Sequence, residues 1–121
     1  MRAALRRYER EHMNVSAGLL FIGAALLEVG GDAVIRKGLR NGSLFLILTG
    51  FIMLGLYGVV VNTVNWDFSR LLGVYIAFFA VVSVVFGGLV FQERVPMTTW
   101  IGLIVICAGA MLIQFGAARG L

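Results

Sequence analysis

The sequence predicts an all-α integral membrane protein whose chain crosses the bilayer four times. Hydrophobic residues occupy 60% of its 121 positions and charged residues only 13%. A soluble domain carries about 25% charged residues, and a domain this short cannot hide so much apolar surface in one core. The apolar residues also fall into four runs, each close to the roughly 20 residues that a helix needs to cross a hydrocarbon layer of about 30 Å.

The four runs predict membrane helices at about residues 15–35, 44–62, 71–91 and 97–117. They lack the alternation typical of barrel strands, and a helix satisfies its own backbone hydrogen bonds in lipid. The first run contains two acids, Glu28 and Asp32, and has no small-residue cleavage site, so we interpret it as a retained helix rather than a signal peptide. Because the links are short, we expect consecutive helices to be antiparallel neighbours.

Residues 1–14 form a polar, basic leader ahead of a transmembrane domain of residues 15–118. Basic side chains of this kind can lie on anionic headgroups. We interpret the leader instead as a frayed, solvated tail, and a true start at Met13 stays open.

The counts of lysine and arginine give a weak orientation signal. Four spans place both termini on one side, which then carries six basic residues: Arg2, Arg6, Arg7, Arg10, Arg70 and Arg119. The other side carries four: Arg36, Lys37, Arg40 and Arg94. A start at Met13 changes the counts to two and four and reverses the sign. Since short loops decide orientation, so small a bias permits insertion both ways.

Several classes of site are not expected from this composition. One cysteine, Cys107, forms neither an intrachain disulfide nor a metal cluster, and we expect it to be a packing residue. The single histidine, His12, lies in the leader and offers no metal site. No nucleophile–base pair is visible, so we expect no enzymatic activity, no metal, no cofactor and no nucleic-acid partner.

Glu28 is the most informative residue because it lies among apolar neighbours in the inner half of the first span. A charge near a helix centre costs about 2.5–3.5 kcal/mol on insertion scales, and intramembrane acids usually face a bundle interior or a water-filled cavity. Such a carboxyl group can exchange a proton and, when ionised, attract a cation. A protonated Glu28 that only bonds a neighbouring helix is the structural alternative.

Asp32 lies one helical turn after Glu28, on the same face, and Arg36 follows one turn later. Asp32 is either a second carboxylate in the same cavity or the partner of Arg36 at the helix end, and we favour the pair. Tyr57 and Tyr75 are candidates to line a cavity, since an aromatic face holds an organic cation with about 0.5–2 kcal/mol.

Glycines form two further patterns. In the fourth span Gly102, Gly109 and Gly116 recur every seven residues and form a smooth stripe that lets two helices approach closely. The stripe serves either a dimer contact or packing within one bundle. Gly87-Gly88 in the third span predicts a kink or, equally, close packing. Trp66, in the link before that span, is expected to be an interfacial anchor.

These residues together resemble the small multidrug resistance family of the drug/metabolite transporter superfamily. The segment GAALLEVG at residues 23–30 is similar to that family's first helix, with Glu28 at the position of its essential acid. The segment GLIVICAG at residues 102–109 is similar to the fourth helix, which forms the dimer contact, and Gln92-Glu93-Arg94 is similar to the loop before it.

The chain departs from the multidrug members in its third span. Tyr75 stands where the family usually has Trp, and Ala77 and Phe79 stand at its Gly-x-Gly kink. Asp32 and Arg70 are also atypical. The segment at residues 28–31, with Arg70 and Tyr75, is also similar to a related, uncharacterised small membrane family of the same superfamily.

The resemblance implies a multi-pass protein of the bacterial inner membrane that works as an antiparallel homodimer with two Glu28 side chains in one cavity. It implies a proton-coupled exporter of small cationic compounds, because protons and substrate compete for those carboxylates. Its partners would be membrane lipid, a second copy, the cationic substrate and protons. A subunit of a lipid-linked sugar flippase is one alternative, although such subunits usually lack the acid in the first helix. A structural or regulatory subunit that moves nothing is another.

Overall fold

The computed structural model describes residues 1–118, and for residues 5–14 and 117–118 it describes the backbone alone. The chain forms four α-helices: α1 (Arg2–Asn41), α2 (Leu44–Val61), α3 (Phe68–Leu89) and α4 (Met97–Ala118). Each contains a stretch long and apolar enough to cross a membrane: Val15–Asn41, Leu44–Val61, Phe68–Leu89 and Met97–Gly116. The prediction of an all-helical protein with four membrane-length helices is confirmed.

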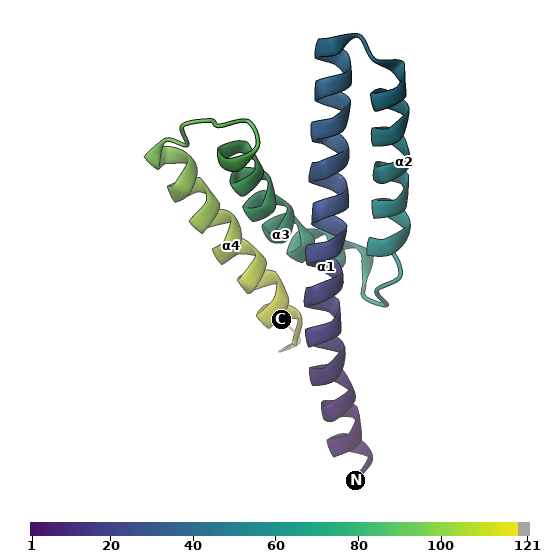
Figure 1. Ribbon diagram of the computed structural model, residues 1–121. Helices are drawn as coiled ribbons and strands as arrows, with labels where there is room; N and C mark the ends of the chain where they lie inside the picture. The colour runs from purple at the N-terminus through teal and green to yellow at the C-terminus, as the bar shows by residue number, and fades with distance from the viewer. Residues whose placement is uncertain (119–121) are drawn as a thin grey trace.

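The first helix is much longer than expected. α1 starts at Arg2 rather than near residue 15, so its backbone shows no break between a leader and the first span (Figure 1). Residues 2–14 contain no glycine or proline and are rich in Ala, Leu, Arg and Glu, which are strong helix formers. The expectation of a frayed backbone there is wrong. How the side chains of residues 5–14 are placed lies outside the described residues.

The link after α1 is correspondingly short. α1 continues through the basic segment to Asn41 and ends at Gly42, whose φ of 65° is the left-handed conformation that favours glycine at a helix end. Ser43 then caps α2 by accepting a hydrogen bond of 3.3 Å from the backbone N–H of Leu46. Two residues therefore reverse the chain and place α2 antiparallel to α1.

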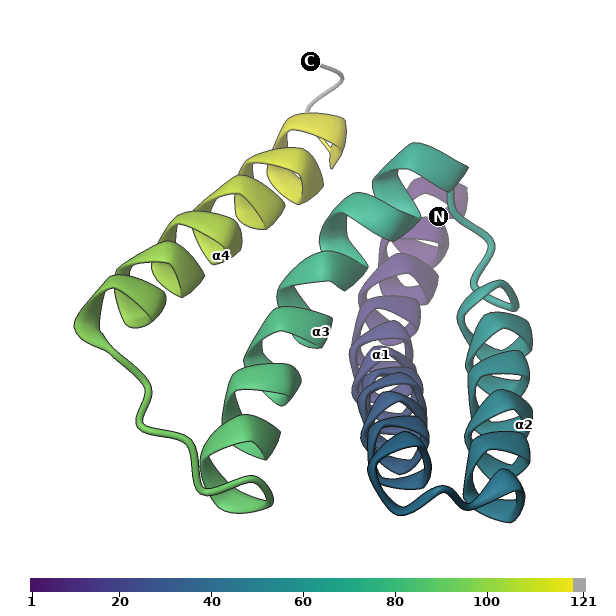
Figure 2. The ribbon, with the colours of Figure 1, turned by 90° about the horizontal axis from the view of Figure 1, so that it is seen from above.

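The helices form a row in the order α2, α1, α3, α4 (Figure 2). α1 packs against both α2 and α3, whereas α4 packs against α3 alone within the described residues. Consecutive helices pack as expected for α1–α2 and α3–α4. The expectation is wrong for α2 and α3, because the link at residues 62–67 carries the chain past α1, so that these two helices meet through side chains and not through their backbones.

Glycines let α1 and α2 approach closely. A Cβ atom added at Gly50 would lie 2.7 Å from the carbonyl oxygen of Gly31 and would also clash with Ile35. Gly38, near the end of α1, is similarly close to the backbone nitrogen of Ile47, at 3.0 Å from an added Cβ. Small residues at such positions are how membrane helices gain van der Waals contact without a hydrophobic drive.

The buried core lies between α1 and α3. Phe21, 1% exposed, is its centre, and the rings of Trp66, Tyr75 and Phe78 meet it edge to face at centroid distances of 5.3, 5.8 and 5.4 Å. Ala24 and Ala25 are fully buried on the same face of α1, and their small side chains let α3 come close. This aromatic cluster fixes how α3 sits on α1.

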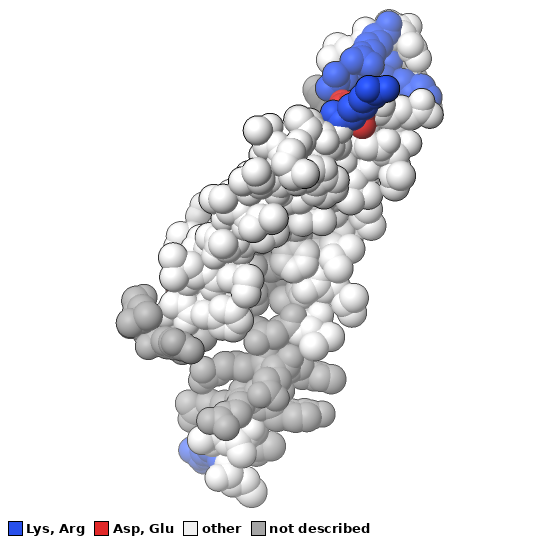
Figure 3. Space-filling view, turned by 90° about the vertical axis from the view of Figure 1, so that its left-hand side faces the viewer, with Lys and Arg blue, Asp and Glu red and all other residues white. Residues whose placement is uncertain are grey.

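The outer surface is that of a membrane protein. Figure 3 shows a large group of basic side chains at one end of the molecule, with some acidic atoms beside it, a broad uncharged band below it, and a smaller basic group at the opposite end. At the end of α1 the exposed basic residues are Arg36, Lys37 and Arg40, and Arg94 is exposed in the link before α4. Many large apolar side chains lie exposed along all four helices, including Phe45, Phe51, Ile104 and Leu112. In a bilayer these side chains would face lipid or another protein.

Candidate functional site

The carboxyl group of Glu28 and the hydroxyl group of Tyr75 meet between α1 and α3. The Tyr75 hydroxyl donates a hydrogen bond of 2.9 Å to Oε1 of Glu28. The Tyr75 ring is 3% exposed and packs edge to face on Phe21, so the hydroxyl is aimed by the core rather than by a mobile side chain. Glu28 itself is half-buried, so its side chain remains partly accessible from outside the chain.

Tyr57 of α2 lies beside Tyr75. Its ring stacks on that of Tyr75, with centroids 5.4 Å apart and an interplanar angle of 28°. Three helices thus contribute one carboxyl group and two phenol rings to a single cluster, which we name the Glu28 cluster: Glu28, Tyr57 and Tyr75. From the sequence we proposed Glu28 as a proton and cation site and the two tyrosines as cavity-lining residues. In the structure all three lie in one cluster.

Within the described residues, the hydrogen-bond partner of the Glu28 carboxyl group is the Tyr75 hydroxyl, and no basic side chain forms a salt bridge with it. Arg36, two turns away, places its guanidinium 5.4 Å from the ring centroid of Phe91 instead. A carboxylate without a fixed cation can take up either a proton or a mobile cation, while π faces beside it attract organic cations. The arrangement therefore suits exchange between these two ligands.

Asp32 occupies a different place. It lines a separate cavity of about 350 Å³ between the later halves of α1 and α3, together with Arg36, Ser83 and Glu93. Within the described residues, no ion pair joins Asp32 to Arg36, so the interpretation that we favoured from the sequence is wrong. The reason is that Arg36 turns toward the α3–α4 link and packs on Phe91.

The glycines of α4 are open, while one glycine of α3 is closely packed. A Cβ atom added at Gly102, Gly109 or Gly116 would meet nothing within 4 Å, so the stripe packs against no other part of the chain that the structure describes. At Gly87 an added Cβ would lie 2.8 Å from Oε2 of Glu93. Gly87-Gly88 lies in the last turn of α3, where it leaves room for Glu93 and cannot bend the middle of the helix.

A second polar contact was missed by the sequence reasoning. Arg70, in the first turn of α3, donates hydrogen bonds from Nε and Nη2 to Oε1 of Gln114 near the end of α4, at 3.1 and 3.0 Å. The guanidinium also lies 4.2 Å from the ring centroid of Trp66. Both are polar residues at the same membrane end of consecutive spans, and this is the sequence feature that could have indicated the contact. Trp66 packs inward on Phe21 as well, so it is more than a surface anchor.

The single cysteine, Cys107, lines a cavity. Cys107 is half-buried at an apolar cavity of about 540 Å³ between α1, α3 and α4. Within the described part of the chain, no group of three or more His, Cys, Asp or Glu side chains is placed to hold a metal ion.

Comparison with known proteins places this geometry in a family context. The model of the family described as "Uncharacterised BCR, YnfA/UPF0060 family" matches residues 14–120. A UPF0060 membrane protein of Nocardia farcinica is 35% identical over 111 residues, covering 89% of this chain and 99% of that protein. One of Mycobacterium marinum is 36% identical over 106 residues (85% and 96%), and YfjF of Bacillus subtilis 31% over 104 (84% and 94%). No solved structure matches the chain.

Proposed function

The chain belongs to the UPF0060 (YnfA) family of membrane proteins, and we propose that it is a proton-coupled exporter of small cationic or amphipathic compounds in the bacterial plasma membrane. The observation that supports this most directly is the Glu28 cluster. It puts a carboxyl group that has no basic partner among the described residues beside two stacked phenol rings, within a membrane-length helix. Protons and organic cations are the two ligands that such a cluster can exchange.

Coupling in this mechanism comes from exclusive occupancy. A proton on Glu28 removes the charge that holds a cation, and a bound cation keeps the proton away. The Tyr75 hydroxyl keeps the carboxyl group in one position in both states, and the Tyr57–Tyr75 stack offers a face for the apolar part of the ligand. Transport then follows when the membrane side that can reach Glu28 alternates.

The functional unit we propose is an antiparallel homodimer. The described helices form an open row in which α4 has one neighbour, so a single chain does not enclose the Glu28 cluster. The open glycine stripe of α4 offers a surface on which a second copy can pack. An antiparallel pair would expose the same site to either side by exchanging the roles of its two chains. It would thereby gain the symmetry that larger transporters obtain from inverted repeats.

The test is substrate-coupled proton flux in proteoliposomes, with tetraphenylphosphonium as the probe cation. We expect wild-type protein to release lumenal protons when the probe is added outside, and Glu28→Gln to abolish this release because the amide keeps the size but cannot titrate. Glu93→Gln, which removes an exposed carboxylate from the α3–α4 link, is the matched control and should retain the flux. Wild-type flux in Glu28→Gln would exclude this mechanism.

The same assay separates the alternative functions. Absence of flux with every cation tried, together with normal insertion, would favour a subunit that transports nothing itself. Movement of a lipid-linked sugar without proton release would favour the flippase alternative.

A further inference from the structure

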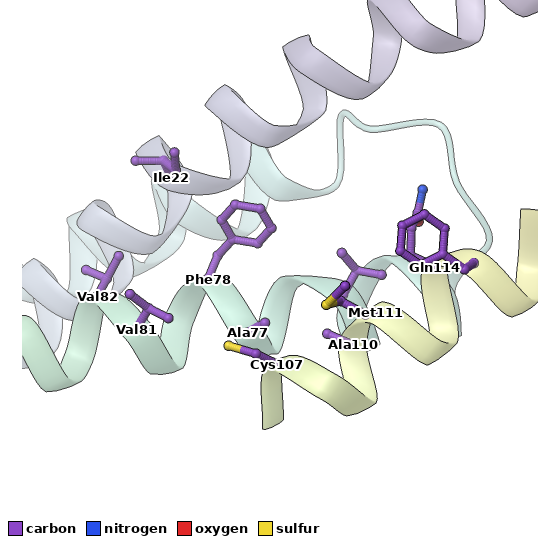
Figure 4. A pocket seen from close by; sticks show the side chains of 11 residues that line it. Ile22, Ala77, Phe78, Val81, Val82, Cys107, Ala110, Met111 and Gln114 are labelled. Carbon is purple, nitrogen blue, oxygen red and sulfur yellow. The ribbon is translucent and has the colours of Figure 1, made fainter. Parts of the chain in front are cut away.

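The apolar cavity between α1, α3 and α4 has the form of a groove that opens between α1 and α4, which do not pack against each other within the described residues. Its volume is about 540 Å³. Figure 4 shows Gln114 at one end, Val82 at the other and the ring of Phe78 between them. Apart from the Gln114 amide, the Cys107 thiol and the Met111 thioether, the lining side chains are hydrocarbon.

The positively charged guanidinium group of Arg70 lies at the Gln114 end of this groove. Arg70 bonds the Gln114 amide oxygen and lies on the Trp66 ring, and both of these partners are neutral. Asp67, the acid nearest to it in sequence, is exposed ahead of α3 and makes neither contact. Within the described residues, the contacts of Arg70 thus include no acid that offsets its charge, and the Nη1 group of Arg70 and the amide NH2 of Gln114 have no hydrogen-bond acceptor there.

The length of the groove matches one leaflet of a bilayer. Arg70, which bonds Gln114 at one end of the groove, and Val82 at the other end are twelve positions apart on α3, which at 1.5 Å per residue is about 18 Å. Half of a hydrocarbon layer of about 30 Å is about 15 Å. The groove thus runs from the membrane interface, where Arg70 and Trp66 lie at the start of α3, to about the midplane.

We propose that this groove is a binding site for an anionic phospholipid. The lipid phosphate accepts hydrogen bonds from Arg70 and Gln114, and one acyl chain lies along α3 past Phe78. Arginine with a neutral amide beside it presents several donors to phosphate oxygens. An anionic lipid is favoured over a zwitterionic one because no acid in the described contacts of Arg70 offsets its charge.

A second copy of the chain does not compete for this groove if it packs on the glycines of α4. Successive helix residues are about 100° apart, so Gly109 lies about 160° around the helix from Cys107 and Met111, which line the groove. The glycine stripe and the groove are therefore on opposite faces of α4, and lipid can fill the groove while the stripe forms a dimer contact.

The experiment is native mass spectrometry of the detergent-purified full chain titrated with dioleoyl phosphatidylglycerol or dioleoyl phosphatidylcholine. We expect tighter binding of phosphatidylglycerol, and about tenfold weaker binding in Arg70→Gln, because a charge-assisted hydrogen bond is lost. Phosphatidylcholine binding should change less. Arg94→Gln removes an equal charge from the exposed α3–α4 link and should bind phosphatidylglycerol like wild type.

Two further variants test headgroup and chain separately. Arg70→Lys keeps the charge but not the paired donors and should fall between wild type and Arg70→Gln. Ala110→Phe fills the groove without touching Arg70 and should weaken both lipids. An excess of inorganic phosphate should not displace the lipid, since it has no acyl chain.

Other outcomes would overturn the proposal. Equal losses in Arg70→Gln and Arg94→Gln would mean that lipid follows net charge rather than this site. Unchanged lipid binding in Ala110→Phe would place the acyl chain elsewhere. Loss of the dimer in Ala110→Phe with lipid binding intact would mean that a second copy occupies the groove.

Discussion

Tyr75 holds Glu28 with a hydrogen bond of 2.9 Å that joins α3 to α1 inside the membrane-length part of both helices. The donor is fixed by an aromatic core, and the acceptor is the acid that we propose carries the proton and the substrate. The packing of the aromatic core therefore determines where the carboxyl group of Glu28 lies.

Tyr75→Phe should lower the initial rate of substrate-coupled proton flux by about tenfold, because a hydrogen bond to a charged group contributes about 1.5–3 kcal/mol. The ring and its packing on Phe21 are kept, so the amount of folded protein should not change. Tyr57→Phe keeps the stacked ring and should lower the rate less, since the hydrogen bond to Glu28 comes from Tyr75. Equal rates in wild type and Tyr75→Phe would show that the bond does not position the acid for transport.

Gly50→Ala should destabilise the protein, because its methyl group would lie 2.7 Å from the Gly31 carbonyl oxygen and force α2 away from α1. We expect a loss of about 1–3 kcal/mol, typical of overpacking, measured as a lower thermal midpoint in detergent. Gly55→Ala is the matched control, since an added methyl group there meets nothing within 4 Å. If both variants melt together with wild type, α1 and α2 do not pack as closely as described.

Gly109→Leu should weaken or abolish the homodimer while leaving membrane insertion intact, because a bulky side chain would hold the two α4 helices apart. Crosslinking and native mass measurement in detergent would report the oligomer. Gly55→Leu adds the same bulk to an equally open glycine of α2 and should leave the dimer unchanged. A dimer of unchanged stability in Gly109→Leu would show that the contact lies elsewhere than on α4.

Single chains should insert in both orientations, since six basic residues on one side face four on the other. Two C-terminal reporters, one active only inside the cell and one only outside, should both give signal. Adding lysines to the α3–α4 link beside Arg94 should shift the balance toward one reporter. Signal from one reporter alone in the wild type would exclude dual insertion and favour a parallel dimer or a partner of opposite orientation.

The sequence predicted the four spans because long apolar runs have one solution in lipid. It also identified Glu28, whose cost in hydrocarbon makes it conspicuous. It could not pair Glu28 with Tyr75, because α3 is apolar all round and no periodic pattern shows which of its faces meets α1. Tyr75 was a candidate only as a cavity aromatic.

The row of helices was also beyond the sequence. Because no hydrophobic effect drives helices together in lipid, the neighbours of each helix are determined by how closely their surfaces fit. Gly31 and Gly50 let α1 and α2 approach each other, and Ala24 and Ala25 of α1 pack in the cluster that contains residues of α3. The start of α1 at Arg2 was missed for another reason: polarity was taken as a sign of disorder, although the leader consists of good helix formers. The contact between Arg70 and Gln114 could not be predicted, because 44 positions separate the two residues.

The position of α4 at the end of the row makes it a separable module. Its described packing is with α3 alone, and every member of the Glu28 cluster comes from α1, α2 or α3. A chain that stops after α3 would keep the residues that handle the ligand and lose the glycine stripe together with one wall of the lipid groove. In the proposed transporter, the residues that bind the ligand and the glycines that form the dimer contact therefore lie on different helices, so a substitution in the stripe changes no contact within the Glu28 cluster.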